Sequence, residues 1–297
     1  MKTTLFVPLL ATLALSAPTA DSKPKYLITF GDSYTQTGFS PTGAAPSPSN
    51  PLGNPALPGW TASGGLNWVG FLVSQLNATS VLSYNFADGG ATTDAALVKP
   101  WKEEVRSFGD QVKQYKEVEK GGRWAGGEVV VGVWMGVNDV GNAWWKPEGE
   151  YEELLEGVGE GLFGEGGLGA VVKGGGVKGV VVLGVPPIHK TPSVLTQTPD
   201  VQTAEAAAIA KYNAALVARL EAFRAAHPAV EAVYVDTAPA FNEALGNPKK
   251  YGSPDATCYN GDGVSCLWFN DYHPGVAINR LVAESVASAW KGKGWFR

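Results

Sequence analysis

Tyr26-Leu27-Ile28-Thr29-Phe30, followed at once by Gly31-Asp32-Ser33-Tyr34, is the stretch from which the fold can be predicted. A run of β-branched and aromatic residues that is closed by glycine is typical of a buried strand ending in a sharp turn. A serine in that turn becomes a nucleophile only if a base lies within hydrogen-bond reach and donors await an oxyanion. Because Gly, Asp and Ser all favour turns, the tripeptide alone is equally typical of an ordinary turn. The functional interpretation therefore depends on the rest of the chain.

Four further segments have the apolar character of buried strands. They span 81–86, 128–135, 177–185 and 231–235. Between them, apolar residues at three- and four-residue spacing predict helices over 66–77, 105–115, 209–223 and 278–290. Continuously apolar strands that alternate with helices indicate a parallel sheet covered on both faces. We expect an α/β fold, a three-layer α/β/α sandwich with a central parallel five-stranded sheet, flavodoxin-like, and one domain over 21–297.

Two segments depart from this alternation. Residues 39–65 are rich in Pro, Ser, Gly and Asn, which predicts a long loop directly after the serine turn. Residues 157–179 contain eleven glycines among twenty-three positions, and each glycine inside a helix costs about 1 kcal/mol relative to Ala. We therefore expect a broken or frayed helix there. A Gly-x-Gly-x-x-Gly pattern at 159–164 follows no strand, so it does not indicate a nucleotide site.

The N-terminus and the cysteines point to export. Residues 1–20 carry Lys2, an apolar segment too short to span a bilayer and then small residues, which predicts a secretory signal peptide. The alternative, a buried N-terminal helix, is disfavoured by the prolines in this segment. Cys258 and Cys266 lie eight residues apart and would pair in an exported chain. Asn77-Ala78-Thr79 is a glycosylation sequon. We expect a secreted, extracellular glycoprotein.

Length and charge set further bounds. A chain of 297 residues, 44% of them hydrophobic, can bury a substantial core. Its formal net charge is −5, and it has no basic cluster, which argues against binding to nucleic acid. No segment after the leader reaches transmembrane length. We expect a monomer with no membrane span.

Polar residues follow three successive predicted strands. Ser33 comes after the first strand, Gly89-Gly90 after the second and Asn138-Asp139 after the third. Ligands in open α/β sheets bind beyond the carboxyl ends of the strands, where these residues would meet. A backbone N–H at a glycine turn and an asparagine amide are suitable donors for an oxyanion hole. Taken singly, the glycines could form a tight turn and Asn138 could cap a helix.

The chain has three histidines that could act as the base. His227 ends a predicted helix, where its charge would favour the helix dipole, so a structural role is expected. His189 follows the fourth strand and could line the mouth of the site. His273 precedes the last helix and has the carboxylate of Asp271 nearby in sequence, as a serine's base requires.

Taken in order, these blocks resemble the SGNH or GDSL hydrolases. The resemblance covers nearly the whole chain after the leader: the Gly-Asp-Ser-Tyr block, the block ending Gly-Gly-Ala-Thr, the Gly-x-Asn-Asp block and the terminal His-Pro block. The longer matches around them resemble the fungal carbohydrate esterases of family sixteen, which implies an acetylesterase acting on oligosaccharides. The resemblance also implies that Ser33 is the nucleophile and His273 the base. In the same way it implies an oxyanion hole formed by Ser33 N–H, Gly90 N–H and Asn138.

The group that orients His273 departs from the superfamily pattern. The superfamily has an aspartate three residues before the histidine, and this chain has Asn270 there, with Asp271 one residue later. An amide is uncharged and cannot stabilise an imidazolium, whereas Asp271 supplies the charge if the loop aims it inward. We therefore predict that Asp271 is the third catalytic residue. Asn270 as the orienter, or a Ser33–His273 dyad with a solvated Asp271, are the alternatives.

The predicted function is a secreted serine esterase that removes short acyl groups, above all acetyl, from plant cell-wall oligosaccharides. The acyl-enzyme forms on Ser33, and the reaction needs no metal or organic cofactor. Its expected partner is an acetylated oligosaccharide or another small ester. The alternatives are a GDSL lipase or lysophospholipase on the same fold, and a catalytically inactive carbohydrate-binding relative.

Overall fold

The computed structural model describes residues 23–174 and 176–297 of the chain. The predicted signal peptide, residues 1–20, lies outside the described residues. Within them, no helix is long and apolar enough to cross a bilayer.

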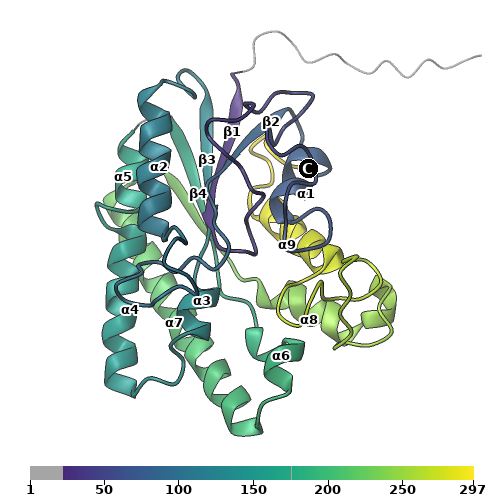
Figure 1. Cartoon of the computed structure of the whole chain (residues 1–297). Coiled ribbons are helices and arrows are strands. Elements are labelled where there is room, and N and C mark those ends of the chain that lie inside the picture. Colours follow the sequence, from purple (N-terminus) through teal and green to yellow (C-terminus); the bar gives the residue numbers. More distant parts are fainter. Residues whose placement is uncertain (1–22, 175) are drawn as a thin grey trace, which may run out of the picture.

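A parallel sheet of five strands forms the centre of the molecule (Figure 1). Its strands are β1 (Lys25–Gly31), β2 (Val81–Asn85), β3 (Glu128–Trp134), β4 (Val177–Leu183) and β5 (Glu231–Val235). They lie side by side in the order β2-β1-β3-β4-β5, and every neighbouring pair is parallel. β1 pairs with β2 on one side and with β3 on the other, so the serine turn leaves the sheet between two neighbours.

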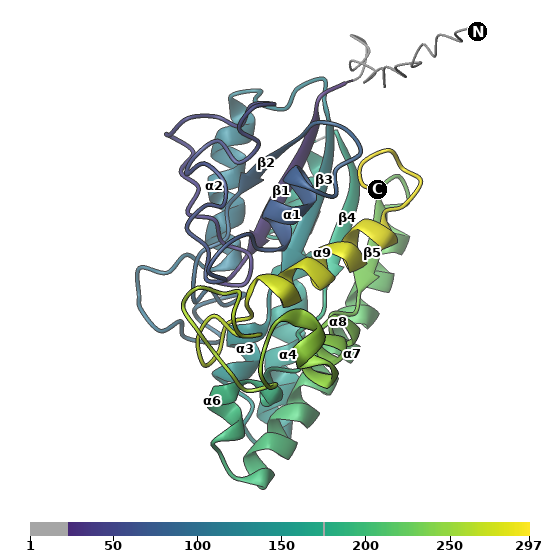
Figure 2. The same ribbon diagram turned by 90° about the vertical axis from the view of Figure 1, so that its right-hand side faces the viewer.

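Helices cover both faces of this sheet (Figures 1 and 2). One face carries α1 (Trp68–Ser74), α8 (Ala238–Gly246) and α9 (Val276–Ala289). The other carries α2 (Phe108–Lys120), α4 (Glu148–Phe163), α5 (Leu168–Lys173) and α7 (Pro199–Ala226). The remaining short elements are α3 (Val137–Gly141), η1 (Ile188–Lys190), α6 (Pro192–Leu195) and η2 (Pro248–Tyr251). The predicted three-layer α/β/α sandwich with its five-stranded parallel sheet is confirmed.

Buried aromatic residues fill the space between the layers. Phe30 of β1 contacts Phe86, Phe108 and Tyr115, which come from the β2 turn and α2. On the opposite face, Trp68 of α1 meets Trp134 of β3 edge to face. Strand residues such as Ile28 and Val131 are fully buried, because helices cover both faces.

The glycine-rich segment differs in detail from its prediction. The break falls at Gly164–Gly167, between α4 and α5, while α4 continues without interruption through Gly157, Gly159 and Gly161. A Cβ on Gly159 would lie 2.7 Å from Nε of Arg219 on α7. This glycine lets α4 and α7 pack closely, which offsets its low helix propensity. Sequence periodicity also missed α8 entirely and placed the start of α7 ten residues too late.

The predicted loop over 39–65 is a folded loop with turns and one isolated bridge, between Ser47 and Asn50. It packs down through Phe39 and Leu52, which are buried, whereas Trp60 is 72% exposed. Cys258 and Cys266 form the predicted disulfide in the loop before α9.

Candidate active site

Ser33 and His273 meet beyond the carboxyl end of β1. The Ser33 Oγ lies 2.7 Å from Nε2 of His273, although the two residues are 240 positions apart in the chain. Ser33 stands in the turn that follows β1, and His273 stands just before α9. This is the hydrogen bond through which an imidazole accepts the proton of a serine hydroxyl.

The other nitrogen of His273 contacts Asn270, and the geometry fixes its tautomer. The Asn270 Oδ1 lies 2.9 Å from Nδ1, and it also accepts the backbone N–H groups of Tyr272 and His273 at 2.9 and 2.7 Å. Two backbone donors can only face the oxygen of the amide, so the amide orientation is unambiguous. Nδ1 therefore carries the proton and donates a hydrogen bond to Oδ1. Nε2 is left bare and accepts the Ser33 hydroxyl.

Asp271 does not take the position that the sequence predicted for it. Its side chain is exposed, and the acceptor at Nδ1 is Asn270. The backbone instead ties Asp271 to α6, because its carbonyl accepts the Ser193 N–H at 2.8 Å. The physical reason is the tight turn: Oδ1 of Asn270 closes the turn through two backbone donors, and this leaves the next side chain pointing outward. The Asp271 carboxylate still acts on His273 through space.

Burial sets the protonation of the candidate base. Desolvation lowers the pKa of His273 to about 4, an effect that the negative charge of Asp271 partly opposes. The imidazole is thus neutral at neutral pH, which is the state that accepts a proton.

Three candidate donors follow the ends of β1, β2 and β3: the Ser33 N–H, the Gly90 N–H and the amide of Asn138, which stands in α3. One N–H of the Asn138 amide donates to the Ala91 carbonyl at 2.9 Å, which orients the amide and leaves its second N–H available. Gly90 has φ +86°, a backbone conformation that favours glycine, and a Cβ there would lie 2.1 Å from Trp101 Cδ1. Ser33, Gly90 and Asn138 all line one cleft. Their arrangement is suited to an oxyanion hole.

Long-range side-chain bonds hold these loops. Asn67, the residue before α1, donates to the carbonyls of Thr35 and Gln36, and Asn85 also donates to Thr35. Both asparagines therefore clamp the turn that carries Ser33. Because they lie 32 and 50 positions from Thr35, local sequence reasoning does not detect them.

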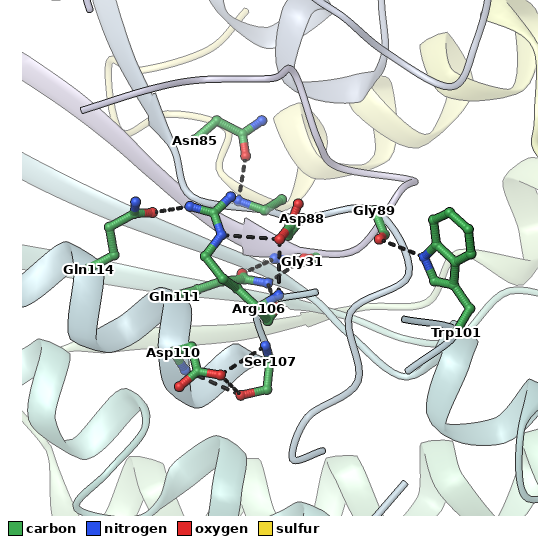
Figure 3. A network of polar contacts seen from close by, with 11 residues as sticks. Gly31, Asn85, Asp88, Gly89, Trp101, Arg106, Ser107, Asp110, Gln111 and Gln114 are labelled. Carbon is green, nitrogen blue, oxygen red and sulfur yellow. Dashed lines mark hydrogen bonds and ion pairs between the residues drawn. The ribbon is translucent and has the colours of Figure 1, made fainter. Parts of the chain in front are cut away.

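A second clamp comes from α2 (Figure 3). The buried Gln111 side chain accepts the Gly31 N–H at 3.0 Å and donates to the Gly31 carbonyl at 2.8 Å. Asp88, in the β2 turn, accepts the N–H and the guanidinium of Arg106 at 3.0 and 3.1 Å. These contacts tie the end of β1 to α2 and the turn after β2 to Arg106, which stands two residues before α2. The candidate donors at Ser33 and Gly90 each lie two residues beyond one of these contacts.

The cleft around Ser33 has a volume of about 650 Å³. Its walls include Gly90, Asn138, Tyr272 and Trp101, and the Trp101 indole donates to the Gly89 carbonyl at 3.3 Å. Trp101 is 66% exposed and presents an apolar face at the mouth of the cleft. His189 lies in η1, and His227 ends α7 against Phe223. Neither of these histidines lines the cleft.

Two buried carboxyls directly adjoin Ser33 and Asn138 in the sequence. Asp32 and Asp139 are fully buried, and burial raises the pKa of Asp32 to about 7 and that of Asp139 to about 6. Asp32 accepts the Tyr34 N–H, and Asp139 accepts the Thr93 N–H. The negative charge of Asp139 raises the pKa of Asp32 further. Among residues 23–174 and 176–297, no group of three His, Cys, Asp or Glu side chains is placed to hold a metal ion.

Residues 27–286 match the model of the family described as GDSL-like Lipase/Acylhydrolase. The chain belongs to this family. As a GDSL-family acylhydrolase it is a carboxylic ester hydrolase, and the resemblance stated from its motifs is confirmed.

Two curated relatives of this GDSL-family chain are fungal acetylesterases. One, from Thermothelomyces thermophilus, is 56% identical over 299 residues, which cover 98% of this chain and 97% of the relative. The other, from Hypocrea jecorina, is 33% identical over 126 residues, which cover 39% of this chain and 35% of the relative.

Two solved structures share the fold. A variant of an acetyl-xylooligosaccharide esterase from Geobacillus superposes with a TM-score of 0.52 at 18% identity, covering 90% of this chain and 94% of that chain. A second variant of the same enzyme, described there as an acetyl xylan esterase from Geobacillus stearothermophilus, gives a TM-score of 0.51 at 18% identity, with the same coverage.

Proposed function

We propose that this protein is a secreted acetylesterase that removes acetyl groups from plant cell-wall oligosaccharides through an acyl-enzyme on Ser33. The observation that carries the proposal is the 2.7 Å contact, in an open cleft, between Ser33 Oγ and Nε2 of His273, whose imidazole is neutral at neutral pH. The acetyl preference is supported by the acetylesterase from Thermothelomyces thermophilus, to which the chain is 56% identical over nearly its whole length.

The proposed reaction has two halves. Ser33 Oγ attacks the carbonyl carbon of the acetyl ester while His273 Nε2 takes its proton, and the oxyanion is held by Ser33 N–H, Gly90 N–H and Asn138. The imidazolium then gives that proton to the sugar oxygen, the C–O bond breaks, and the sugar leaves as an alcohol. Water repeats the sequence on acetyl-Ser33, with His273 again as the base, and releases acetate.

We assign the third position to Asn270 as a positioning residue. Its oxygen holds the Nδ1 proton, which keeps Nε2 bare in the resting enzyme. The charge that an aspartate would supply comes instead from the exposed Asp271, which favours the imidazolium through space. Water screens that interaction, so we expect its contribution to be small.

Secretion is supported by the leader-like residues 1–20 and by the disulfide between Cys258 and Cys266, since disulfides persist in oxidising compartments. The sequon at Asn77 lies on a partly exposed turn at the end of α1, where its side chain donates to the Thr79 carbonyl. We also propose that the substrate is a plant cell-wall oligosaccharide and that the protein is a monomer.

Hydrolysis of p-nitrophenyl esters tests the proposal. We expect kcat/KM to be highest for the acetate and to fall at least tenfold by the octanoate, and Ser33→Ala to lose at least 10³-fold of the activity while it stays folded. Wild-type levels of turnover in Ser33→Ala would exclude the mechanism. A preference for the octanoate would indicate a lipase, and absence of turnover by the folded wild-type protein would indicate a binding protein.

A further inference from the structure

A second hollow adjoins the catalytic cleft and contains a buried carboxylate that the proposed mechanism does not use. This hollow, here called the Glu205 pocket, has a volume of about 340 Å³. It lies between α3, the turn after α3, α6 and the first half of α7. These elements gather beyond the carboxyl end of the sheet (Figures 1 and 2). Its walls include Asn142, Trp144, Ser193, Gln197, Val201 and Glu205.

The pocket is continuous with the catalytic cleft. Asn138, Asn142 and Tyr272 line both spaces. Asn138 is the candidate oxyanion donor and Tyr272 directly precedes His273. A ligand group in the Glu205 pocket therefore lies next to the ester that Ser33 attacks, so the two spaces can hold neighbouring units of one substrate.

Glu205 is unusual for a side chain of α7. It is only 2% exposed, and its buried Oε2 has no hydrogen-bond partner. Among the described residues, none forms an ion pair or a hydrogen bond with the carboxyl group of Glu205, and burial alone raises the pKa of this group, to about 7. Burying a carboxyl oxygen without a partner costs free energy, so such a group in a native fold calls for an explanation. A ligand that brings donors supplies one.

The chemistry of the walls selects the ligand. Among the residues that line the pocket, Asn142, Ser193 and Gln197 carry amide and hydroxyl groups, while Trp144 and Val201 are apolar. A pyranose ring has hydroxyl donors on its rim and an apolar face, so it can satisfy both kinds of surface. A long acyl chain would leave Glu205 and the amides without partners, which disfavours it.

We propose that the Glu205 pocket is a subsite for the sugar unit next to the acetylated one. Glu205 is then a specificity-determining residue that accepts hydrogen bonds from the hydroxyl groups of this neighbouring sugar unit. The inference rests on the proposed function, because it assigns a binding site to the sugar that is the leaving group of the same reaction. It is distinct from that function, because an acetylesterase need not bind a second sugar unit.

Glu205→Gln tests the subsite with acetylated xylose, xylobiose and xylotriose as substrates. For the wild-type protein we expect KM to fall from the monosaccharide to the disaccharide. In Glu205→Gln we expect KM for acetylated xylobiose and xylotriose to rise about fivefold to tenfold, while kcat stays within twofold. We also expect the loss of kcat/KM on these two substrates to exceed the loss on p-nitrophenyl acetate at least fivefold.

Two further measurements separate binding from a structural role. Glu221→Gln changes an exposed glutamate farther along the same helix and serves as the matched control, with no change in either kinetic constant. The melting temperature of Glu205→Gln should not fall, because the carboxyl that it replaces has no partner for Oε2. Titration calorimetry measures the binding of acetylated xylotriose to Ser33→Ala and to the double variant Ser33→Ala with Glu205→Gln. The double variant should bind it about fivefold to tenfold more weakly.

Each contrary outcome is informative. Equal losses on xylotriose and p-nitrophenyl acetate, together with a lower melting temperature, would make Glu205 a structural residue and overturn the subsite. A change confined to p-nitrophenyl octanoate would show that the pocket takes an acyl chain, which also overturns it. If the wild-type protein cleaved p-nitrophenyl acetate but none of the acetylated sugars, the proposed function itself would fail.

Discussion

In the proposed mechanism the neutral side chain of Asn270 has one of the two roles of a carboxylate, because it orients the imidazole of His273. The amide oxygen is oriented by the N–H groups of Tyr272 and His273, so it can only accept a hydrogen bond from an N–H group at Nδ1. An asparagine beside Nδ1 has one disadvantage: a flipped amide would donate a hydrogen bond to Nδ1 and stabilise the tautomer that carries its proton on Nε2. The two backbone N–H groups prevent that flip. What the amide cannot supply is charge, and the neutral imidazole of the buried His273 is consistent with that.

The first expected outcome separates Asn270 from Asp271. Asn270→Ala removes the acceptor for Nδ1 and the two turn bonds, and should lower kcat by about 10²-fold or more. Asp271→Asn keeps the tautomer and should lower kcat less than about fivefold.

Because the Asp271 charge raises the pKa of His273, its removal should move the acid limb of kcat/KM to lower pH. Rate profiles of p-nitrophenyl acetate hydrolysis over pH 3–8 measure both effects.

A collapse of kcat in Asp271→Asn, with Asn270→Ala close to wild type, would reverse the assignment and restore the carboxylate that the sequence predicted. Circular dichroism of Asn270→Ala is the necessary control, since its loss of two backbone partners could also loosen the turn. Asn270→Asp keeps both partners. It should retain more activity than Asn270→Ala.

At the scale of elements, the site is a set of loops held by helices from other parts of the chain. α2 carries Gln111, whose side chain makes the same pair of bonds to Gly31 that a neighbouring strand would make. This brace lies two residues before Ser33. The position of the candidate nucleophile therefore depends on how α2 packs against β1.

Gln111→Met tests this dependence. The substitution keeps the length of the side chain but leaves the buried Gly31 N–H without an acceptor, which costs about 1–3 kcal/mol. We expect the melting temperature to fall by about 3–10 °C and kcat to fall at a temperature where the protein is folded. Gln114→Met, one turn later on the same helix, removes only a partly exposed bond to Arg106 and should change both values much less. Equal effects of the two changes would contradict the role of Gln111.

The five strands were predictable because each is a continuous apolar run, and the positions of Ser33, Gly90 and Asn138 followed from the rule that sites form at the carboxyl ends of such strands. His273 could be selected from three histidines by its sequence neighbours. Gln111, Asn67 and Glu205 could not be found in this way. Each acts through a partner or a pocket that is distant in sequence, and each stands in a helix or loop pattern that has an ordinary local explanation.

At the scale of the whole molecule, the buried acids set how stability depends on pH. The folded pKa of Asp32, about 7, lies above its ordinary value of 3.8. The folded protein therefore holds a proton that the unfolded chain releases between about pH 4 and pH 7. The stability that Asp32 contributes is full below pH 3.8 and is lost as pH rises through 7. Asp139 acts in the same direction with a folded pKa of about 6, whereas His273, with its lowered pKa, acts in the opposite direction between pH 4 and 6.5.

Asp32→Asn should therefore change the slope of stability against pH. The amide keeps the oxygen that accepts the Tyr34 N–H but cannot ionise, so the variant should gain stability relative to wild type as pH rises from 5 to 8. The gain is at most about 1.4 kcal/mol per pH unit, and it should level off above pH 7. Urea unfolding at pH 5, 6, 7 and 8 measures it, with Asp200→Asn, an exposed position on α7, as the control that should run parallel to wild type. If the Asp32→Asn curve also ran parallel, the carboxyl would hold one protonation state over this range. Asp32 would then play no part in the pH response of the fold.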